Sequence, residues 1–131
     1  MKITRHEYFV YITTNPNRTA LYVGVTSDIG RRLVKHYANR GFPDTHAGKY
    51  YCDCLVYLEM YQYIEDAINR EKEIKKWGRA QKLDLIAGFN PKWKFLNQEW
   101  CEEWPPQFVW REYYEGLRAE KKDKNKGAAK G

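Results

Sequence analysis

The stretch ALYVGVTSDIGRR, residues 20–32, decides the fold, because a strand pattern changes into a helix pattern within it. ALYVGV is rich in β-branched and aromatic side chains, which favour strands. A Thr-Ser pair then provides an N-cap. Ile29, Leu33 and Tyr37 follow at a spacing of four, which predicts a helix with one apolar stripe. We expect this helix to end near Asn39.

The residues on either side of this stretch indicate a small antiparallel sheet. EYFVYITT at 7–14 has strand composition, and a polar turn containing Asn-Pro joins it to 20–25 as a hairpin. We expect the elements that follow to be a loop at 40–49, a strand at 51–59, a long helix at 63–78 and a short helix at 79–87. The order β-β-α-β-α-α predicts an α/β domain of the α+β type, in which helices flank a three-stranded antiparallel sheet.

The composition changes after residue 96. Residues 97–120 are acidic and aromatic, and a helix is expected in them from about residue 107, after two prolines. Residues 121–131 are basic, have no aliphatic anchor and are expected to be disordered. We therefore predict one globular domain over 1–96, a C-terminal helical extension over 97–120 that offers a surface to a protein partner, and a tail.

Composition also excludes several classes of protein. No stretch approaches the roughly 20 consecutive apolar residues of a membrane span, and MKITRHEYFV lacks the apolar core of a signal peptide. The three cysteines are an odd number, which argues for free thiols. We expect a soluble cytoplasmic protein without a membrane partner.

The CxC of Cys52 and Cys54 permits two interpretations. With His46 and Cys101 these thiols could form a zinc site, but the spacing matches no structural zinc signature. Apolar packing on one strand face, beside Val56 and Leu58, is the better interpretation, since an unpaired cysteine behaves as a small hydrophobic residue.

Positive charge is concentrated in the first half of the chain. The net charge is +6, and residues 1–50 carry 8 basic side chains against 3 acidic ones. Such a distribution favours a polyanionic partner such as DNA, although many proteins that bind no nucleic acid are also basic. The side chains expected to contact it are Arg31, Lys35, Arg40 and Lys49.

Strand alternation predicts where the tyrosines of the hairpin point. If the aliphatic residues of both strands face the core, Tyr11 and Tyr22 share the opposite face. Gly24, next to Tyr22 on that face, leaves room for a close approach of backbone or ligand. The plainer explanation is that tyrosines are common in strands, and this chain has 11 of them.

The first helix and the long helix add polar residues beside these tyrosines. Arg32 and His36 are four apart and lie on one face, where they could hold a phosphate and move a proton; a solvated arginine is the alternative. Glu71 falls on the apolar stripe of the long helix, between Ala67 and Ile74. A carboxylate there needs a metal or an ion pair, and a structural salt bridge is the alternative.

These residues, in this order, resemble the GIY-YIG nuclease domain. The first signature element is Phe9-Val10-Tyr11 and the second is Tyr22-Val23-Gly24. GVTSDIGRRLVKH and AINREKEIKKWGRAQKLDLI are similar to the family's first helix and to its glutamate helix. The resemblance covers about residues 5–96 and is greatest to small stand-alone bacterial members related to the amino-terminal domain of a DNA-repair excinuclease.

The resemblance implies hydrolysis of DNA phosphodiester bonds with one divalent cation, Mg²⁺ or Mn²⁺. It implies that Tyr11 is a general base or positions water, that Tyr22 bonds the phosphate or nucleophile, and that Arg32 stabilises developing charge. Glu71 would hold the metal. His36 would assist, and Asn90 is a further candidate for the catalytic set.

We therefore predict a structure-selective or weakly specific endonuclease that acts on DNA, branched or flapped, in repair or recombination. The alternative is a nucleic-acid-binding module of the same fold that does not cleave. Binding alone requires no carboxylate that faces the core, so Glu71 favours the nuclease.

Overall fold

The computed structural model describes residues 7–106, and its centre is a three-stranded antiparallel sheet. The strands are β1 (Tyr8–Thr14), β2 (Leu21–Thr26) and β3 (Cys54–Tyr61), in the spatial order β2-β1-β3. β1 is central because the hairpin turn pairs it with β2 on one side and β3 returns along its other side.

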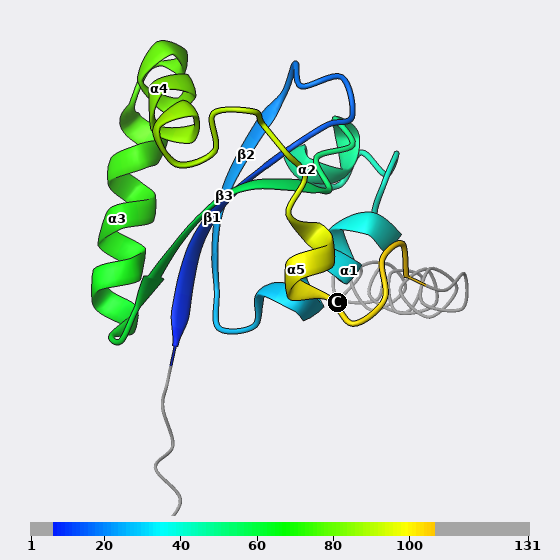
Figure 1. Cartoon of the computed structure of the whole chain (residues 1–131), viewed down its shortest axis with the longest axis horizontal. Helices are drawn as coiled ribbons and strands as arrows, with labels where there is room; N and C mark the ends of the chain where they lie inside the picture. Colours follow the sequence, from blue (N-terminus) through cyan, green and yellow to red (C-terminus); the bar gives the residue numbers. More distant parts are fainter. Residues whose placement is uncertain (1–6, 107–131) are drawn as a thin grey trace, which may run out of the picture.

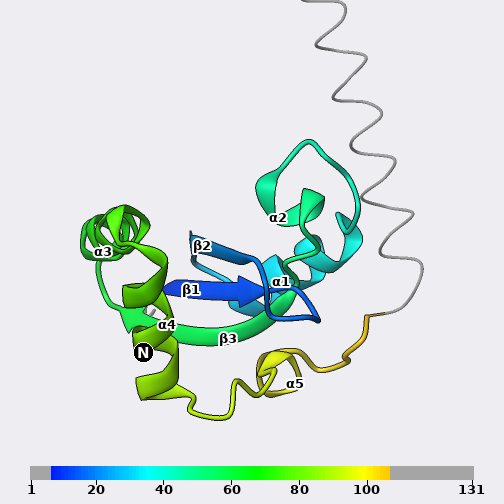
Figure 2. The same cartoon turned by 90° about the horizontal axis from the view of Figure 1, so that it is seen from above.

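Helices cover both faces of this sheet. They are α1 (Ile29–Ala38), α2 (His46–Lys49), α3 (Ile64–Lys76), α4 (Arg79–Phe89) and α5 (Asn97–Trp100). α3 and α4 lie on one side of the sheet, and α1 and α5 lie on the other (Figures 1 and 2). The predicted three-stranded antiparallel sheet with flanking helices is therefore confirmed, with α2 and α5 as additional short helices.

Each face of the sheet has its own apolar core, as strand alternation requires. On the side of α3 and α4, Val10 and Ile12 pack with Ala67 and Ile74. On the opposite side, Phe9 and Tyr11 pack with residues of α1 and with Leu96. The face predicted to carry the tyrosines is thus correct, but it is a second core rather than an open surface.

The third strand differs from the predicted 51–59. It begins only at Cys54, because Tyr51 has a positive φ of 59° and its carbonyl accepts a turn hydrogen bond from the Asp53 amide. A register shift opposite Ile12 and Thr13 then inserts one extra residue in β3. The long helix is also slightly shorter than the predicted 63–78.

This bulge changes which side chains share a face. Val56 and Tyr57 both pack in the core beneath α3, whereas Leu55 and Leu58 pack on the other side. The prediction that Val56 and Leu58 lie on one face is therefore wrong, because a bulge shifts the alternation by one residue. Cys52 and Cys54 are buried, and all three cysteines are free thiols.

Two short helices were not predicted, because a single turn has no measurable periodicity. α2 lies in the expected loop 40–49, and its N-cap Thr45 accepts a hydrogen bond from the Gly48 amide at 3.0 Å. α5 follows Leu96, and the buried Asn97 side chain bonds the backbone of Leu55 and Asp53.

The segment beyond residue 106 has no structural description. The helix expected from about residue 107 and the tail 121–131 lie outside the described residues, so the division of the chain at residue 97 stays a prediction. Within residues 7–106, no helix has both the length and the apolar character needed to cross a bilayer.

Candidate active site

The site is built around a buried hydrogen bond between β1 and α1. The Tyr11 hydroxyl and the His36 Nε2 atom lie 2.7 Å apart, and both side chains are almost fully buried, at 0% and 8% exposure. Central strand β1 fixes Tyr11, and the apolar stripe of α1 turns His36 toward the sheet. Two polar groups that satisfy each other in an apolar setting form a rigid unit.

Burial sets the protonation of this pair. Burial, and then the nearby Tyr22, raise the pKa of the Tyr11 hydroxyl far above its usual value, while Arg32 opposes the increase. Burial, and then the positive charges of Arg32 and Lys35, lower the pKa of His36 to about 3. Both side chains are therefore neutral at neutral pH, so a proton can be exchanged between them without an existing buried charge.

Tyr22 and Gly24 complete one wall of the site from β2. The Tyr22 ring lies 6.1 Å from the Tyr11 ring and 5.1 Å from the His36 ring, measured between centroids. A Cβ atom on Gly24 would lie only 2.5 Å from the Tyr11 hydroxyl oxygen. The space predicted beside Gly24 is therefore filled by the Tyr11 ring, which reaches over β2.

The two adjacent arginines have different environments. Arg31 is exposed, whereas Arg32 is half-buried and its charge affects the pKa values of Tyr11 and His36. Within residues 7–106 the Arg32 guanidinium has no hydrogen bond or ion pair with another side chain. The N–H donors of Arg32 are therefore available to an anion beside the tyrosines.

Glu71 reaches the same region from α3. Its side chain is 14% exposed, and its charge contributes to the raised pKa of Tyr11. Its carboxylate pairs with Lys75 at 2.8 Å, one helical turn later, and Lys75 is itself half exposed. The predicted alternative of a structural salt bridge is thus partly met, although the partner is Lys75 rather than Arg32.

Asn90 is placed differently from the other predicted site residues. Its amide nitrogen donates to the carbonyls of Val56 and Lys94, at 3.1 Å and 2.8 Å, and its oxygen accepts from the Lys94 amide. These bonds fix the end of α4 against β3, the edge strand opposite β2. In the described part of the chain, no hydrogen bond or ring contact joins it to Tyr11, so its observed role is structural.

The predicted contacts to nucleic acid lie on and after α1. Arg31, Lys35 and Lys49 are exposed, as binding to a phosphate backbone requires. Arg40 is half-buried: its Nε donates to the Tyr37 carbonyl at 2.9 Å, and its guanidinium stacks 3.5 Å above the Tyr37 ring. Arg40 is therefore partly committed to holding the end of α1.

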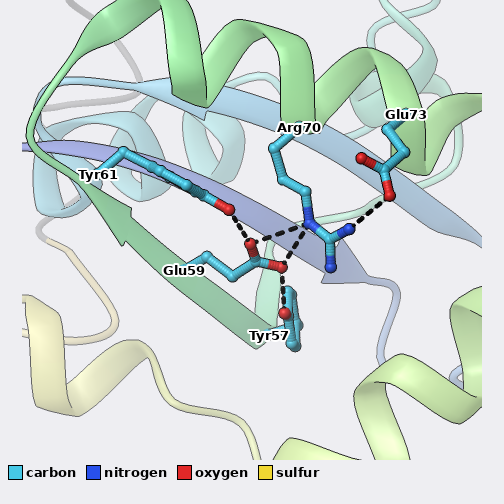
Figure 3. A network of polar contacts seen from close by, with 5 residues as sticks. All are labelled: Tyr57, Glu59, Tyr61, Arg70 and Glu73. Carbon is cyan, nitrogen blue, oxygen red and sulfur yellow. Dashed lines mark hydrogen bonds and ion pairs between the residues drawn. The ribbon is translucent and has the colours of Figure 1, made fainter.

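A polar network on the opposite face anchors the helix that carries Glu71. The Glu59 carboxylate of β3 accepts hydrogen bonds from the hydroxyls of Tyr57 and Tyr61 and from Arg70 Nε at 3.0 Å, and Arg70 also pairs with Glu73 (Figure 3). Burial alone would raise the pKa of Glu59, but these donors hold it below its usual value. The network was not predicted, although the alternation of Tyr57, Glu59 and Tyr61 on one strand face is a signal for it.

The comparison with known protein families agrees with this geometry. The model of the GIY-YIG catalytic domain matches residues 7–84, which include both signature tyrosines, Arg32, His36 and Glu71. The fold and the buried polar cluster thus define a domain of the nuclease type. The chain belongs to the GIY-YIG family.

The curated relatives are small proteins of about the size of this domain. A UPF0213 protein of Staphylococcus epidermidis is 38% identical over 80 residues, which cover 61% of this chain and 94% of that protein. A UPF0213 protein of Staphylococcus haemolyticus is 35% identical over the same shares of both chains. The solution NMR structure of the UPF0213 protein BH0048 from Bacillus halodurans is 26% identical, with a TM-score of 0.44, and the match covers 70% of this chain and 95% of that one.

Proposed function

We propose that this protein is a metal-dependent endonuclease that hydrolyses DNA phosphodiester bonds, with low sequence specificity and a preference for branched or flapped DNA, in repair or recombination. The observation that carries the proposal is the buried Tyr11–His36 hydrogen bond with Arg32 and Glu71 beside it. Packing alone would be served as well by apolar side chains, whereas two neutral proton-exchanging groups next to an unpaired guanidinium suit phosphate chemistry.

Tyr11 and His36 would move the proton of the attacking water. Tyr11 is neutral, so its oxygen can accept a proton from water only as its own proton passes to the Nε2 atom of neutral His36. The water oxygen then bonds to phosphorus, the bond from phosphorus to the leaving oxygen breaks, and that oxygen takes a proton from solvent. A phosphate anion bound nearby would raise the pKa of His36 and so improve it as the acceptor.

Arg32 and Tyr22 would hold the phosphate. Negative charge grows on the nonbridging oxygens as the nucleophile attacks, and a preorganised guanidinium in a partly buried site stabilises that charge more than it would in water. The Tyr22 hydroxyl is a second donor from the same wall of the site. This division of roles explains why Arg32, and not the exposed Arg31, is the residue that matters.

The residues around Glu71 fit a magnesium-type cation. Mg²⁺ retains several waters and uses one or two carboxylates together with substrate phosphates, whereas zinc requires three or four protein ligands. Residues 7–106 contain no group of three or more His, Cys, Asp or Glu side chains that could hold a metal, but Glu71 supplies one poorly exposed carboxylate near Tyr11. When bound there, Mg²⁺ or Mn²⁺ would polarise the phosphate and favour negative charge on the attacking and leaving oxygens.

The proposal also covers the cellular setting and the C-terminal extension. We place the protein in the cytoplasm, where its three free cysteines would stay reduced. We also propose that the acidic extension 97–120 contacts a protein partner, because it is rich in aromatic residues.

The test is a nicking assay on labelled flapped, branched and plain duplex DNA of one sequence, with Mg²⁺, Mn²⁺ or a chelator. We expect metal-dependent cleavage that is fastest on the flapped or branched substrates and is lost in Glu71→Ala and Tyr11→Phe. Salt-sensitive binding without cleavage of any substrate would instead identify a binding module of the same fold, and equal cleavage by both variants would exclude the mechanism.

A further inference from the structure

A second polar feature lies at the start of β2, outside the tyrosine cluster. It is an open pocket of about 330 Å³ whose lining residues are Ala20, Leu21, His46, Tyr50, Arg79 and Lys82. β2 separates α2, which supplies His46, from the α3–α4 pair, and Arg79 is the first residue of α4 (Figures 1 and 2). Three segments that are distant in sequence therefore converge on one hollow.

The lining of this pocket carries positive charge only. Arg79 and Lys82 are cationic, His46 adds an imidazole, and none of the six lining residues is a carboxylate. Within the described part of the chain, neither Arg79 nor Lys82 forms an ion pair with an acidic residue. Two cations without a counter-charge in one concave site call for an anionic ligand.

Local hydrogen bonds hold two of these groups in place. Arg79 Nη2 donates to the Thr19 carbonyl at 2.8 Å, which uses one of its five N–H donors and leaves the others without a partner among residues 7–106. His46 Nε2 lies 3.3 Å from the Leu21 carbonyl, and because a carbonyl can only accept, Nε2 carries the proton. The pocket is therefore partly preorganised by the edge of β2.

An aromatic side chain stands at the rim of the pocket. Tyr50 is 43% exposed, its ring lies 4.8 Å from the His46 ring, and Lys49 Nζ lies 5.3 Å from the Tyr50 ring centroid. Exposed aromatic rings beside cations stack on nucleobases, while the cations contact the backbone. The chemistry of the pocket thus matches a nucleotide unit better than a small inorganic anion.

Leu21 directly precedes Tyr22, so the pocket adjoins the tyrosine cluster along β2. We infer that the pocket binds a phosphate of the nucleic-acid strand next to the cleaved bond, with Arg79 and Lys82 on the phosphate and Tyr50 stacked on a base. This inference rests on the proposed nuclease function for its geometry, but it concerns binding and can be tested without cleavage.

The experiment measures binding of a labelled single-stranded DNA oligonucleotide to the full chain carrying Glu71→Gln, by fluorescence anisotropy over a range of salt concentrations. Adding Lys82→Gln should weaken binding about threefold to tenfold at low salt and flatten the slope of log Kd against log salt by about one unit. Tyr50→Ala should weaken binding at all salt concentrations, since stacking is not screened. Lys72→Gln, an exposed lysine on α3 outside the pocket, is the matched control.

Unchanged affinity and slope in Lys82→Gln and Arg79→Gln, relative to Lys72→Gln, would overturn the inference. So would binding of inorganic phosphate to the pocket that does not compete with the oligonucleotide. If the wild-type protein cleaves no DNA and Lys82→Gln still reduces binding, the pocket stands and the nuclease proposal fails. If the protein cleaves and the pocket variants bind normally, the reverse holds.

Discussion

The Tyr11 hydroxyl and the His36 Nε2 atom lie 2.7 Å apart in a buried contact that joins the central strand to the first helix. The contact has two consequences that can be measured separately. It links the protonation of His36 to the stability of the fold, and it places a neutral proton acceptor beside the hydroxyl that we propose to receive the proton of water.

Removal of the hydroxyl alone tests the second consequence. Tyr11→Phe keeps the ring that packs over Gly24 but breaks the bond to His36, so cleavage should fall by about 10²-fold or more. Stability should fall by only about 1–3 kcal/mol, the cost of leaving one buried polar group unpaired. Single-turnover cleavage and urea unfolding of the same samples separate these effects, and a variant that cleaves at the wild-type rate would exclude Tyr11 from the reaction.

The packing of Tyr11 over β2 can be tested at Gly24. A Cβ atom there would approach the Tyr11 ring to 2.5 Å, so Gly24→Ala should destabilise the protein by about 1–3 kcal/mol, through overpacking. Gly88, in the exposed part of α4, has no atom within 4 Å of an added Cβ. Gly88→Ala is therefore the control and should stabilise by about 0.5–1 kcal/mol. Equal melting temperatures of the two variants would contradict the close contact.

Burial of neutral His36 predicts loss of stability in acid. Its pKa falls from an ordinary value of 6.5 in the unfolded chain to about 3 in the folded one. The stabilisation is therefore fully present above about pH 6.5 and is lost as the pH falls toward 3, because the unfolded state takes up the proton first. Acidification from neutral pH to about pH 5 should cost about 2 kcal/mol through this group.

His36→Gln isolates this contribution. Asp53 acts in the opposite sense, since burial raises its pKa to about 6 and it stabilises the folded state only when protonated. Because both forms of the protein contain Asp53, the difference between their curves of unfolding free energy against pH reports His36. Parallel curves between neutral pH and about pH 5 would show that His36 is not buried in the neutral form.

The anchor of the metal-binding helix is open to a similar comparison. Arg70→Met would leave the Glu59 carboxylate without its cation while its two tyrosine donors remain, and should cost about 2 kcal/mol, less than for a fully buried pair. Lys72→Met, two residues later on the exposed side of α3, should change stability by less than about 0.5 kcal/mol. Chemical denaturation decides, and similar losses in both variants would deny the network a stabilising role.

Much of the architecture could be predicted because its signals are local. The hairpin, α1 and the face shared by Tyr11 and Tyr22 follow from alternation and from spacing of four. That α1 and α5 cover the tyrosine face was not predicted, because α5 is a single turn held by the buried Asn97 side chain. Burial of Tyr11, and hence its altered pKa, depends on that covering.

Other features depend on contacts between distant segments. The bulge in β3 shifts the alternation by one residue without any glycine or proline to mark it. The pocket at the start of β2 forms only when α2 and α4 meet the hairpin, and nothing in the sequence around their basic residues signals it. Asn90 illustrates the opposite error: a residue type suited to a site serves instead to fix α4 against β3.

The two neighbouring arginines give the most direct test of the central claim that the Tyr11–His36 cluster is a nuclease site. Arg32 is half-buried beside Tyr11, and Arg31 is exposed on the same turn. The measurement is the single-turnover rate of flapped-DNA cleavage in Mn²⁺ by Arg32→Met and Arg31→Met at saturating protein. The account predicts a loss of about 10²-fold or more for Arg32→Met and less than about threefold for Arg31→Met. Equal rates in the two variants, or a larger loss in Arg31→Met, would contradict it.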